Sequence, residues 1–374
     1  MSLEAKKENK RSGVLICGAY GMENGGDEAI LEAIVGEMRA IDPDMPVTVL
    51  SRTPERTAKK DGVASLHMFD LPGFLRVMKE CTLYINGGGN LIQDVTSSRS
   101  LWYYLYTLRA AKRRGCRVLM YGCGIGPVSR PRNRSVAKRY IDRYVDEITL
   151  REENSLDELR SFGVTRPRIT VASDPALTLP PAPEGEVDEK MRSLGLDPNG
   201  AYVCFCLRSW EGFGERADCF ARAADYVFER YGMEPVFLSV NTRSDGAAAQ
   251  SAARTISAPC RIIAEPMPTD MTIGIISRMR AVVSIRLHGL IFAASQAVPS
   301  VGIAYDPKVS AFLDYIGQEN YATLDALTAQ GLCDMLDRAL DTDREALSQR
   351  VGQLRSIESR NSAAVRRLLG MEEE

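Results

Sequence analysis

Short apolar runs rich in β-branched residues alternate with amphipathic helical stretches along most of this 374-residue chain. This alternation limits the fold strongly, because a parallel strand needs a long crossover, usually a helix, to reach its neighbour. Strands covered by helices on both faces read as continuous apolar runs. We therefore expect an α/β fold with largely parallel sheets. In the first half the predicted strands are residues 14–17, 47–50, 81–85, 117–121, 147–150 and 169–172, and the clearest helices are 28–41, 100–114 and 136–145.

The chain is longer than one hydrophobic core usually supports, so two domains are expected. The segment TLPPAPEGEVDE, rich in proline and acids, is the best candidate linker, and it divides the chain into residues 1–180 and 181–374. After it the pattern restarts, which predicts two Rossmann-like domains in tandem with a central cleft. Residues 324–369 read as charged helices that pack on the domains, and the terminal helix is a candidate to cross back to the first one. The predicted elements of the second half are strands 202–207, 236–240 and 261–264 and helices 217–231, 246–256 and 271–279.

Bulk composition excludes several classes of protein. The net charge of −2 gives no reason to expect nucleic acid as a partner. The nine cysteines fall mostly in apolar runs and read as reduced core residues, without the paired spacing of a zinc site. No metal or cofactor is expected. The polar N-terminus and the absence of a long apolar run predict a cytoplasmic protein.

The segment SIRLHGLIFAASQAVPSVGIAYDPK (284–308) is the best candidate for an anion site. If residues 281–287 form a strand, alternation places Arg286 and His288 on the same side. A helix that starts near Gly289 would direct its free N–H groups to the same place, and Lys308 follows the next strand, 300–305. Such a set suits a ligand with a phosphate and a carboxylate. The alternative is that Arg286 and Lys308 pair with acids such as Asp306, while His288 is a core residue.

Three strands of the first half run into glycine, giving GAYGMENGGDEAI, INGGGNLIQD and YGCGIGP. The first of these segments lacks the spacing of a dinucleotide fingerprint. Either the glycines only permit tight turns, or they let the backbone approach a neutral ligand such as a sugar. The sugar-binding candidates on these segments are Gly21, Asn24, Asp27, Asn86, Gly88, Gly89, Asn90, Gln93 and Asp94.

Three further residues follow predicted strands. Arg151 and Arg208 are candidate anion-binding residues, and Asp174 stands in a similar place. Arg151 has an alternative role in a cap or salt bridge, and Arg208 in the contact between domains. The sequence also contains two clusters of basic residues. Each cluster is either a solvated helix face or a surface that binds an anionic membrane. They comprise Arg109, Lys112, Arg113, Arg114 and Arg117, and then Arg130, Arg132, Arg134, Lys138, Arg139 and Arg143.

Taken together, GGGNLIQDVTSSRSLWYYL, YGCGIGP and SIRLHGLIFAASQAVPSVGIAYDPKV resemble the polysaccharide pyruvyltransferases of the CsaB type. GAYGMENGGDEAIL and TLREENS fit the same pattern, so the resemblance extends over residues 13–317. It implies a fold like that of GT-B glycosyltransferases and transfer of a pyruvyl group from phosphoenolpyruvate to a sugar.

The resemblance also implies an acceptor, β-linked N-acetylmannosamine of a lipid-linked cell-wall precursor. The product is then a 4,6-pyruvate ketal of a secondary cell-wall polysaccharide, which anchors S-layer proteins, and the enzyme works at the inner face of the cell membrane. Galactose acceptors also occur in the family. On this view Arg286, His288, Lys308, Arg151 and Arg208 bind phosphoenolpyruvate.

Ketal formation needs a proton donor and a base. We assign His288 as the proton donor, because histidine titrates near neutral pH, and Asp94 or Asp27 as the base that accepts the hydroxyl proton. Two rival hypotheses are a GT-B glycosyltransferase that uses a nucleotide sugar and a non-catalytic sugar or anion sensor. In the sensor, replacing His288 would leave binding intact.

Overall fold

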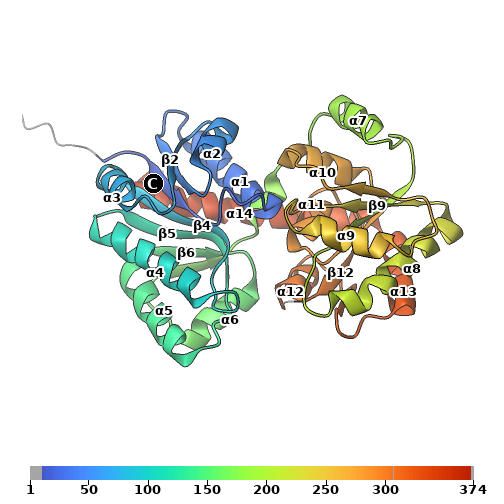
Figure 1. Cartoon of the computed structure of the whole chain (residues 1–374). Helices are drawn as coiled ribbons and strands as arrows, with labels where there is room; N and C mark the ends of the chain where they lie inside the picture. Colours follow the sequence, from blue (N-terminus) through green and yellow to red (C-terminus); the bar gives the residue numbers. More distant parts are fainter. Residues whose placement is uncertain (1–10, 306, 372–374) are drawn as a thin grey trace, which may run out of the picture.

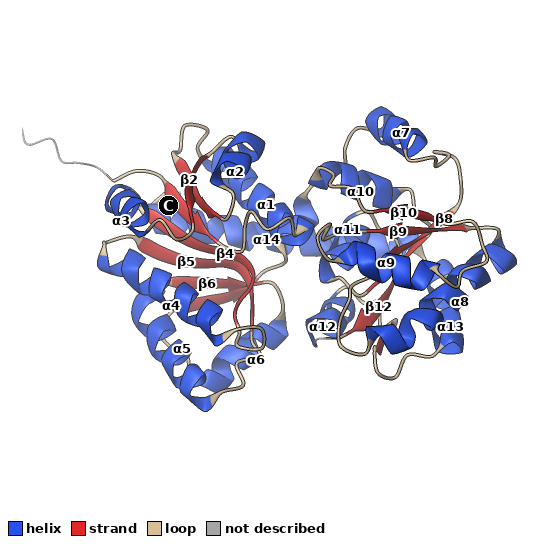
Figure 2. Cartoon of the chain, viewed as in Figure 1, coloured by secondary structure: helices blue, strands red, loops and turns tan. Residues whose placement is uncertain are grey.

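The computed structural model describes residues 11–305 and 307–371 and divides them into two lobes (Figures 1 and 2). Each lobe contains one sheet in which every pair of neighbouring strands is parallel. The strand order is β3-β2-β1-β4-β5-β6-β7 in the first lobe and β10-β9-β8-β11-β12-β13 in the second. Both orders reverse direction once, as in Rossmann folds. The predicted α/β architecture of two Rossmann-like domains is confirmed.

The first lobe is built around the sheet of β1 to β7. Its strands are β1 (Val14–Cys17), β2 (Val47–Ser51), β3 (Ala64–His67), β4 (Leu83–Ile92), β5 (Arg117–Ile125), β6 (Glu147–Leu150) and β7 (Arg168–Val171). Its helices are α1 (Gly25–Ile41), α2 (Pro54–Asp61), α3 (Leu71–Glu80), α4 (Ser98–Arg113), α5 (Pro131–Tyr144) and α6 (Glu153–Phe162), followed by the 3₁₀ turn η1 (Pro175–Thr178).

The second lobe is built around the sheet of β8 to β13. Its strands are β8 (Tyr202–Cys206), β9 (Glu234–Leu238), β10 (Arg261–Ile263), β11 (Ala281–Ser284), β12 (Ser300–Ala304) and β13 (Tyr321–Thr323). Its helices are α7 (Glu184–Ser193), α8 (Phe213–Tyr231), α9 (Asp245–Ala253), α10 (Thr269–Ser277), α11 (Leu287–Ser295), α12 (Pro307–Tyr315), α13 (Ala329–Leu340) and α14 (Arg344–Leu369).

Burial on both faces explains the apolar strands. All four residues of β1 and all five of β8 are buried, so polar alternation is absent there. Helix α1 shows the opposite pattern, with an apolar stripe on one face. In α1 this stripe includes Ile30, Ile34 and Met38, which pack on the first sheet.

Two glycine-rich segments belong to strands rather than to loops, contrary to our reading of them as turns at strand ends. β4 continues through Gly87, Gly88 and Gly89, and its register with β5 shifts between Gly89 and Ile92. Gly88 and Gly89 have positive φ values of 53° and 68°, which glycine adopts without strain. A Cβ on Gly88 would lie 1.9 Å from Ile30, so glycine also permits α1 to pack on β4.

The proline-rich segment after residue 178 is only partly a linker, because it also contains α7. Val187 and Met191 of this helix are buried in the core of the second lobe. The spacing of Val187 and Met191 among acidic residues is the sequence signal that indicates this helix.

The last helix joins the two lobes. Leu347, Val351 and Leu354 of α14 pack in the core of the second lobe, whereas Ala364 and Val365 pack in that of the first. Figure 1 shows α14 running behind the junction of the lobes and ending on the first one. The C-terminal part of the chain therefore contributes to both cores.

Candidate active site

The residues of the predicted anion site lie at the turn between β11 and α11. β11 ends at Ser284, earlier than predicted, and Arg286 is the N-cap of α11. Gly289 permits the helix to start this close to the sheet, since a Cβ there would lie 2.5 Å from Ser284 Oγ. Arg286 and His288 thus come together through a helix N-terminus and not through the alternation of a strand. The turn lies where the strand order of the second sheet reverses.

His288 lies against the first turn of α1 in the other lobe. A Cβ on Gly26 would approach its Nδ1 atom to 2.0 Å, so only glycine fits at that position. Its Nε2 atom is buried and has no hydrogen-bond partner within residues 11–305 and 307–371. Burial, followed by the charges of Arg151, Lys308 and Arg286, lowers the pKa of His288 to about 3. The imidazole is therefore neutral in the free protein at pH 7.

Asp27 is the carboxylate that shares this environment. It accepts a hydrogen bond from Asn24 and lies beside β4, where a Cβ on Gly89 would be 3.2 Å from its Oδ1 atom. Burial raises the pKa of Asp27 to about 6, although Asn24 and the charges of Arg151 and Lys308 act in the opposite direction. Since the same two cations act on both Asp27 and His288, the structure brings residues of both lobes into one site.

Arg151 is a buried cation held in place by two carboxylates. Its side chain is 4% exposed and donates to Glu152 at 2.7 Å and to Asp174 at 3.2 Å. Gly124 makes room for it, because a Cβ there would lie 2.9 Å from the guanidinium. The salt bridge considered as an alternative role for Arg151 is therefore present. It also fixes the orientation of the guanidinium at the end of β6.

Arg286 is likewise paired, but with a partner that we did not predict. Its Nε atom donates to both oxygens of Asp245, at 3.0 and 3.1 Å, and its Nη2 atom donates to Ser244 Oγ at 2.8 Å. Asp245 is 1% exposed and lies in the first turn of α9. Asp306, the partner considered from the sequence, lies outside the described residues.

Arg208 and Lys308 flank an aromatic pair on the second lobe. Arg208 donates to the Tyr305 hydroxyl at 2.5 Å and lies over Trp210, with 4.5 Å between guanidinium and ring centroid. Lys308 Nζ lies 5.2 Å from the centre of the Tyr305 ring. Tyr305 therefore links two of the predicted anion-binding residues. Tyr305 is not among the predicted site residues, and the one sequence signal for it is its position directly after β12.

Asp94 has a structural environment. It is 6% exposed and accepts hydrogen bonds from Ser129 N at 2.7 Å, Arg130 N at 3.1 Å and Asn133 Nδ2 at 2.8 Å. These donors lie at the start of α5, so Asp94 caps that helix. The geometry therefore favours Asp27 over Asp94 as the base.

The other predicted sugar-binding residues are dispersed. Gln93 bonds to Thr96, Asn90 donates to Gly126 O, and Asn86 is fully buried within β4. Gly21 has a φ of +76° and donates to Glu28, beside a different cavity. Of this set, Asn24, Asp27 and Gly89 lie at the site with His288.

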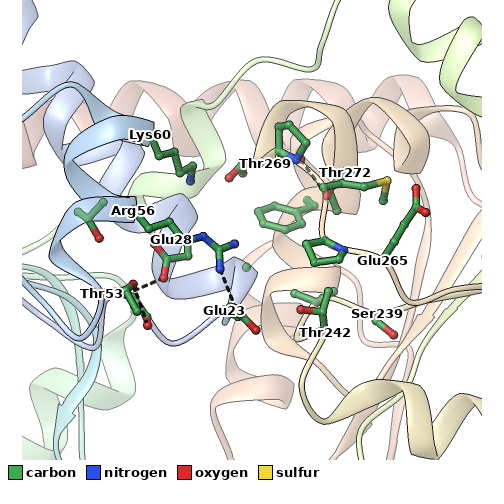
Figure 3. Close-up of a pocket in the computed structure, with 18 residues that line it drawn as sticks. Glu23, Glu28, Thr53, Arg56, Lys60, Ser239, Thr242, Glu265, Thr269 and Thr272 are labelled. Carbon is green, nitrogen blue, oxygen red and sulfur yellow. Dashed lines mark hydrogen bonds and ion pairs between the residues drawn. The ribbon is translucent and has the colours of Figure 1, made fainter.

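The lobes touch along a line beside this site. Asn24 and Asn241 form an antiparallel bridge, Gly25 N donates to Val240 O at 2.9 Å, and Glu23 pairs with Arg243 at 2.8 Å. A cavity of about 330 Å³ lies between side chains of the two lobes next to this contact (Figure 3).

Within the described residues, no helix is both long and apolar enough to cross a bilayer.

Comparison with known proteins agrees with this architecture. Similar solved structures include a glycosyltransferase from Rickettsia africae ESF-5, with 12% identity, a TM-score of 0.61 and coverage of 96% of this chain and 99% of that chain. A UDP-GlcNAc 2-epimerase from Methanocaldococcus jannaschii has 12% identity, a TM-score of 0.63 and coverage of 92% and 99%. Anabaena HepE in complex with UDP-glucose has 11% identity, a TM-score of 0.63 and coverage of 94% and 99%. These likenesses identify the fold as GT-B-like.

A family model described as polysaccharide pyruvyl transferase matches residues 24–307. The match begins at the N-cap of α1 and ends at the start of α12, so it contains Asp27, Arg151 and His288 together with the contact between the lobes. The family indicates a transferase that acts in polysaccharide pyruvylation. On this match, which covers most of the chain, the protein belongs to the polysaccharide pyruvyl transferase family.

Proposed function

We propose that the protein transfers a pyruvyl group from phosphoenolpyruvate to a sugar and forms a 4,6-ketal with release of phosphate. The observation that supports this most is that Arg151, Lys308 and Arg286 all lie near enough to His288 for their charges to lower its pKa. Phosphoenolpyruvate carries a carboxylate and a phosphate, and three cations near one titratable ring suit such a ligand. Arg208 extends this cationic surface along Tyr305.

The reaction adds one proton to the methylene carbon of phosphoenolpyruvate, which becomes a methyl group. Two hydroxyl oxygens of one sugar then bond to the former enol carbon, and the bond from that carbon to the phosphate oxygen breaks. Of the two protons that the hydroxyls lose, one balances the proton gained by the methyl group and the other leaves with phosphate. No oxidation or reduction takes place.

We assign His288 to the proton delivered to the methylene carbon. The free protein keeps the ring neutral, but the negative charge of phosphoenolpyruvate opposes the surrounding cations and favours protonation. We assign Asp27 to the hydroxyl proton, since its pKa near 6 leaves it ionised at neutral pH and its environment is shared with His288. Asn24 orients this carboxylate through a hydrogen bond.

For the acceptor we propose β-linked N-acetylmannosamine on a lipid-linked cell-wall precursor, as in the CsaB type. A lipid-linked acceptor requires the enzyme to reach a membrane surface. The surface that fits this best is a groove between α5 and α6, lined by Arg134, Lys138, Arg139, Arg143 and Arg166. Beside α5, Trp102 and Tyr106 on α4 are 42% and 43% exposed, as is usual at membrane interfaces.

The test is incubation with phosphoenolpyruvate and a synthetic lipid analogue of N-acetylmannosaminyl-β-N-acetylglucosamine. We expect phosphate release together with a product that has gained one pyruvate ketal, detected by mass spectrometry and assigned by NMR. Tight binding of a UDP-sugar without phosphate release would instead support a glycosyltransferase. Binding of both ligands with no turnover would support a sensor.

A further inference from the structure

The cavity between the lobes lies behind the candidate active site. Gly25 and Glu28 of α1 line the cavity, whereas Gly26, between them in the same turn, contacts His288. Phe292 also lines it, and its ring centroid lies 6.1 Å from that of His288. One turn of α1 and one turn of α11 therefore separate the cavity from the candidate active site. Figure 3 shows side chains of the two lobes facing each other across this cavity.

The lining of the cavity has more carboxylates than cations, with Glu23, Glu28 and Glu265 against two basic residues. Its two lining cations are Arg56, which pairs with Glu23 at 2.7 Å, and Lys60, which pairs with Glu32 at 3.3 Å. Glu28 adds a carboxylate to the same wall. A second phosphate-bearing ligand would meet carboxylates here and would have to compete with existing ion pairs, so a neutral ligand fits better.

The remaining lining is apolar with hydroxyl groups at its edges. Phe292 and Met267 provide an apolar wall, and Thr242 provides a hydroxyl from the loop that follows β9. Ser239 also lines the cavity, is 7% exposed, and has a hydroxyl with no hydrogen-bond partner in the described part of the chain. Carboxylates and hydroxyls that surround an apolar wall match a pyranose ring, which has polar edges and an apolar face.

We propose that this cavity is a second sugar-binding site, which holds one neutral pyranose unit between the lobes. Its volume of about 330 Å³ is at the small end of the range for ligand pockets, which fits one ring rather than a longer glycan. The sugar is either a neighbouring unit of the acceptor or a separate molecule. Only the identification of this sugar as part of the acceptor rests on the proposed function. Binding of a sugar in the cavity does not require that the protein transfers a pyruvyl group.

The test fills the cavity and measures sugar binding directly. Thr242→Trp and Met267→Trp each place a large ring in the cavity, from two different loops. If one variant does not fold, the other still allows sugar binding to be measured. Thr255→Trp makes the same change on an exposed turn of the same lobe and is the matched control. Saturation-transfer NMR with the uncharged methyl glycosides of N-acetylmannosamine and N-acetylglucosamine gives the affinity, and thermal unfolding verifies the fold.

We expect wild type, Thr255→Trp and His288→Gln to bind at least one of these glycosides. Both filling variants should lose about tenfold or more in affinity for the N-acetylglucosamine glycoside, because the proposed acceptor site itself binds N-acetylmannosamine. Sugar binding that is lost in His288→Gln but retained in the filling variants would overturn the inference. So would the absence of binding in wild type. Failure of pyruvyl transfer with this binding pattern intact would count only against the proposed function.

Kinetics with monosaccharide and disaccharide acceptors identify the source of the sugar. If the cavity holds a neighbouring acceptor unit, the disaccharide has the higher kcat/KM in wild type, and Thr242→Trp removes that advantage. An equal loss for both acceptors identifies a separately bound sugar. Kinetics and affinities that are unchanged in both filling variants would refute the site.

Discussion

His288 is the residue whose protonation must change if the proposed reaction is right. It is neutral in the free protein, because burial and three nearby cations hold its pKa at about 3. Phosphoenolpyruvate brings negative charge into contact with these cations, so its binding should be coupled to uptake of a proton. Calorimetric titration in buffers of different ionisation enthalpy measures this uptake.

His288→Gln should remove that proton uptake and lower kcat by about 100-fold or more, the scale of general acid catalysis. Phosphoenolpyruvate should still bind, since Arg151 and Lys308 remain. Equal proton uptake in wild type and variant would assign the titrating group to another residue.

Asp27 and Asp94 provide a matched pair of carboxylates with different environments. Asp27→Asn should lower kcat/KM by about 100-fold, and in wild type kcat/KM should fall as the pH drops below about 6, where Asp27 gains a proton. Asp94→Asn removes an ionised cap of α5, so we expect a loss of about 1–3 kcal/mol of stability and a lower Tm.

Steady-state kinetics over pH 5–8 and thermal unfolding separate these effects. Near-normal turnover by Asp27→Asn, with loss of turnover by folded Asp94→Asn, would reverse the assignment of the base.

At the scale of elements, α5 carries the surface that we assign to the membrane. Arg139 and Arg143 are exposed along it and line the basic groove. Charge reversal of both should weaken binding to vesicles with anionic lipids by tenfold or more, since each basic residue near such a surface contributes about 1 kcal/mol. Vesicle co-sedimentation at several salt concentrations measures the effect.

Arg222→Glu, on the exposed face of α8, is the control for that change. Equal binding of wild type to neutral and anionic vesicles would contradict the electrostatic interpretation of the groove.

Elements with continuous apolar runs could be predicted almost to the residue, as β1 and β6 show. The sequence does not predict that the glycine segment of β4 is a strand. Its strand conformation depends on pairing with β5, which the local sequence does not reveal. The same limit applies to the site. Arg286, His288 and Lys308 follow strands and could be predicted, whereas Asp245 lies 41 residues from Arg286 and became its partner only through folding. The contact of Gly26 with His288 needed the second lobe in place.

At the scale of the whole molecule, we expect Glu358 on α14 to make the packing of the two lobes sensitive to pH. Burial, chiefly, raises its pKa to about 7, and it interacts with Tyr121 of the first lobe and with Asn361. A carboxyl that is more basic when folded binds more protons in the native state between about pH 4.5 and 7. Its contribution to stability is therefore complete below that range and is lost as the pH rises through it.

Glu358→Gln should consequently be more stable than wild type at pH 8, by up to about 3 kcal/mol, and should lose this advantage near pH 5. Thermal unfolding at both pH values tests this, with Glu345→Gln on the exposed first turn of α14 as control. A difference in Tm that does not change with pH would contradict the role given to Glu358.

The position of α14 has a further consequence for how the protein is made. Ala364 and Val365 complete the core of the first lobe, yet they leave the ribosome long after β1 to β7. Domains generally fold from the N-terminus as synthesis proceeds. Here the hydrophobic core beside the first sheet is complete only after the last helix has been synthesised. We therefore expect nascent chains that end before residue 360 to expose apolar surface on the first lobe and to depend on chaperones.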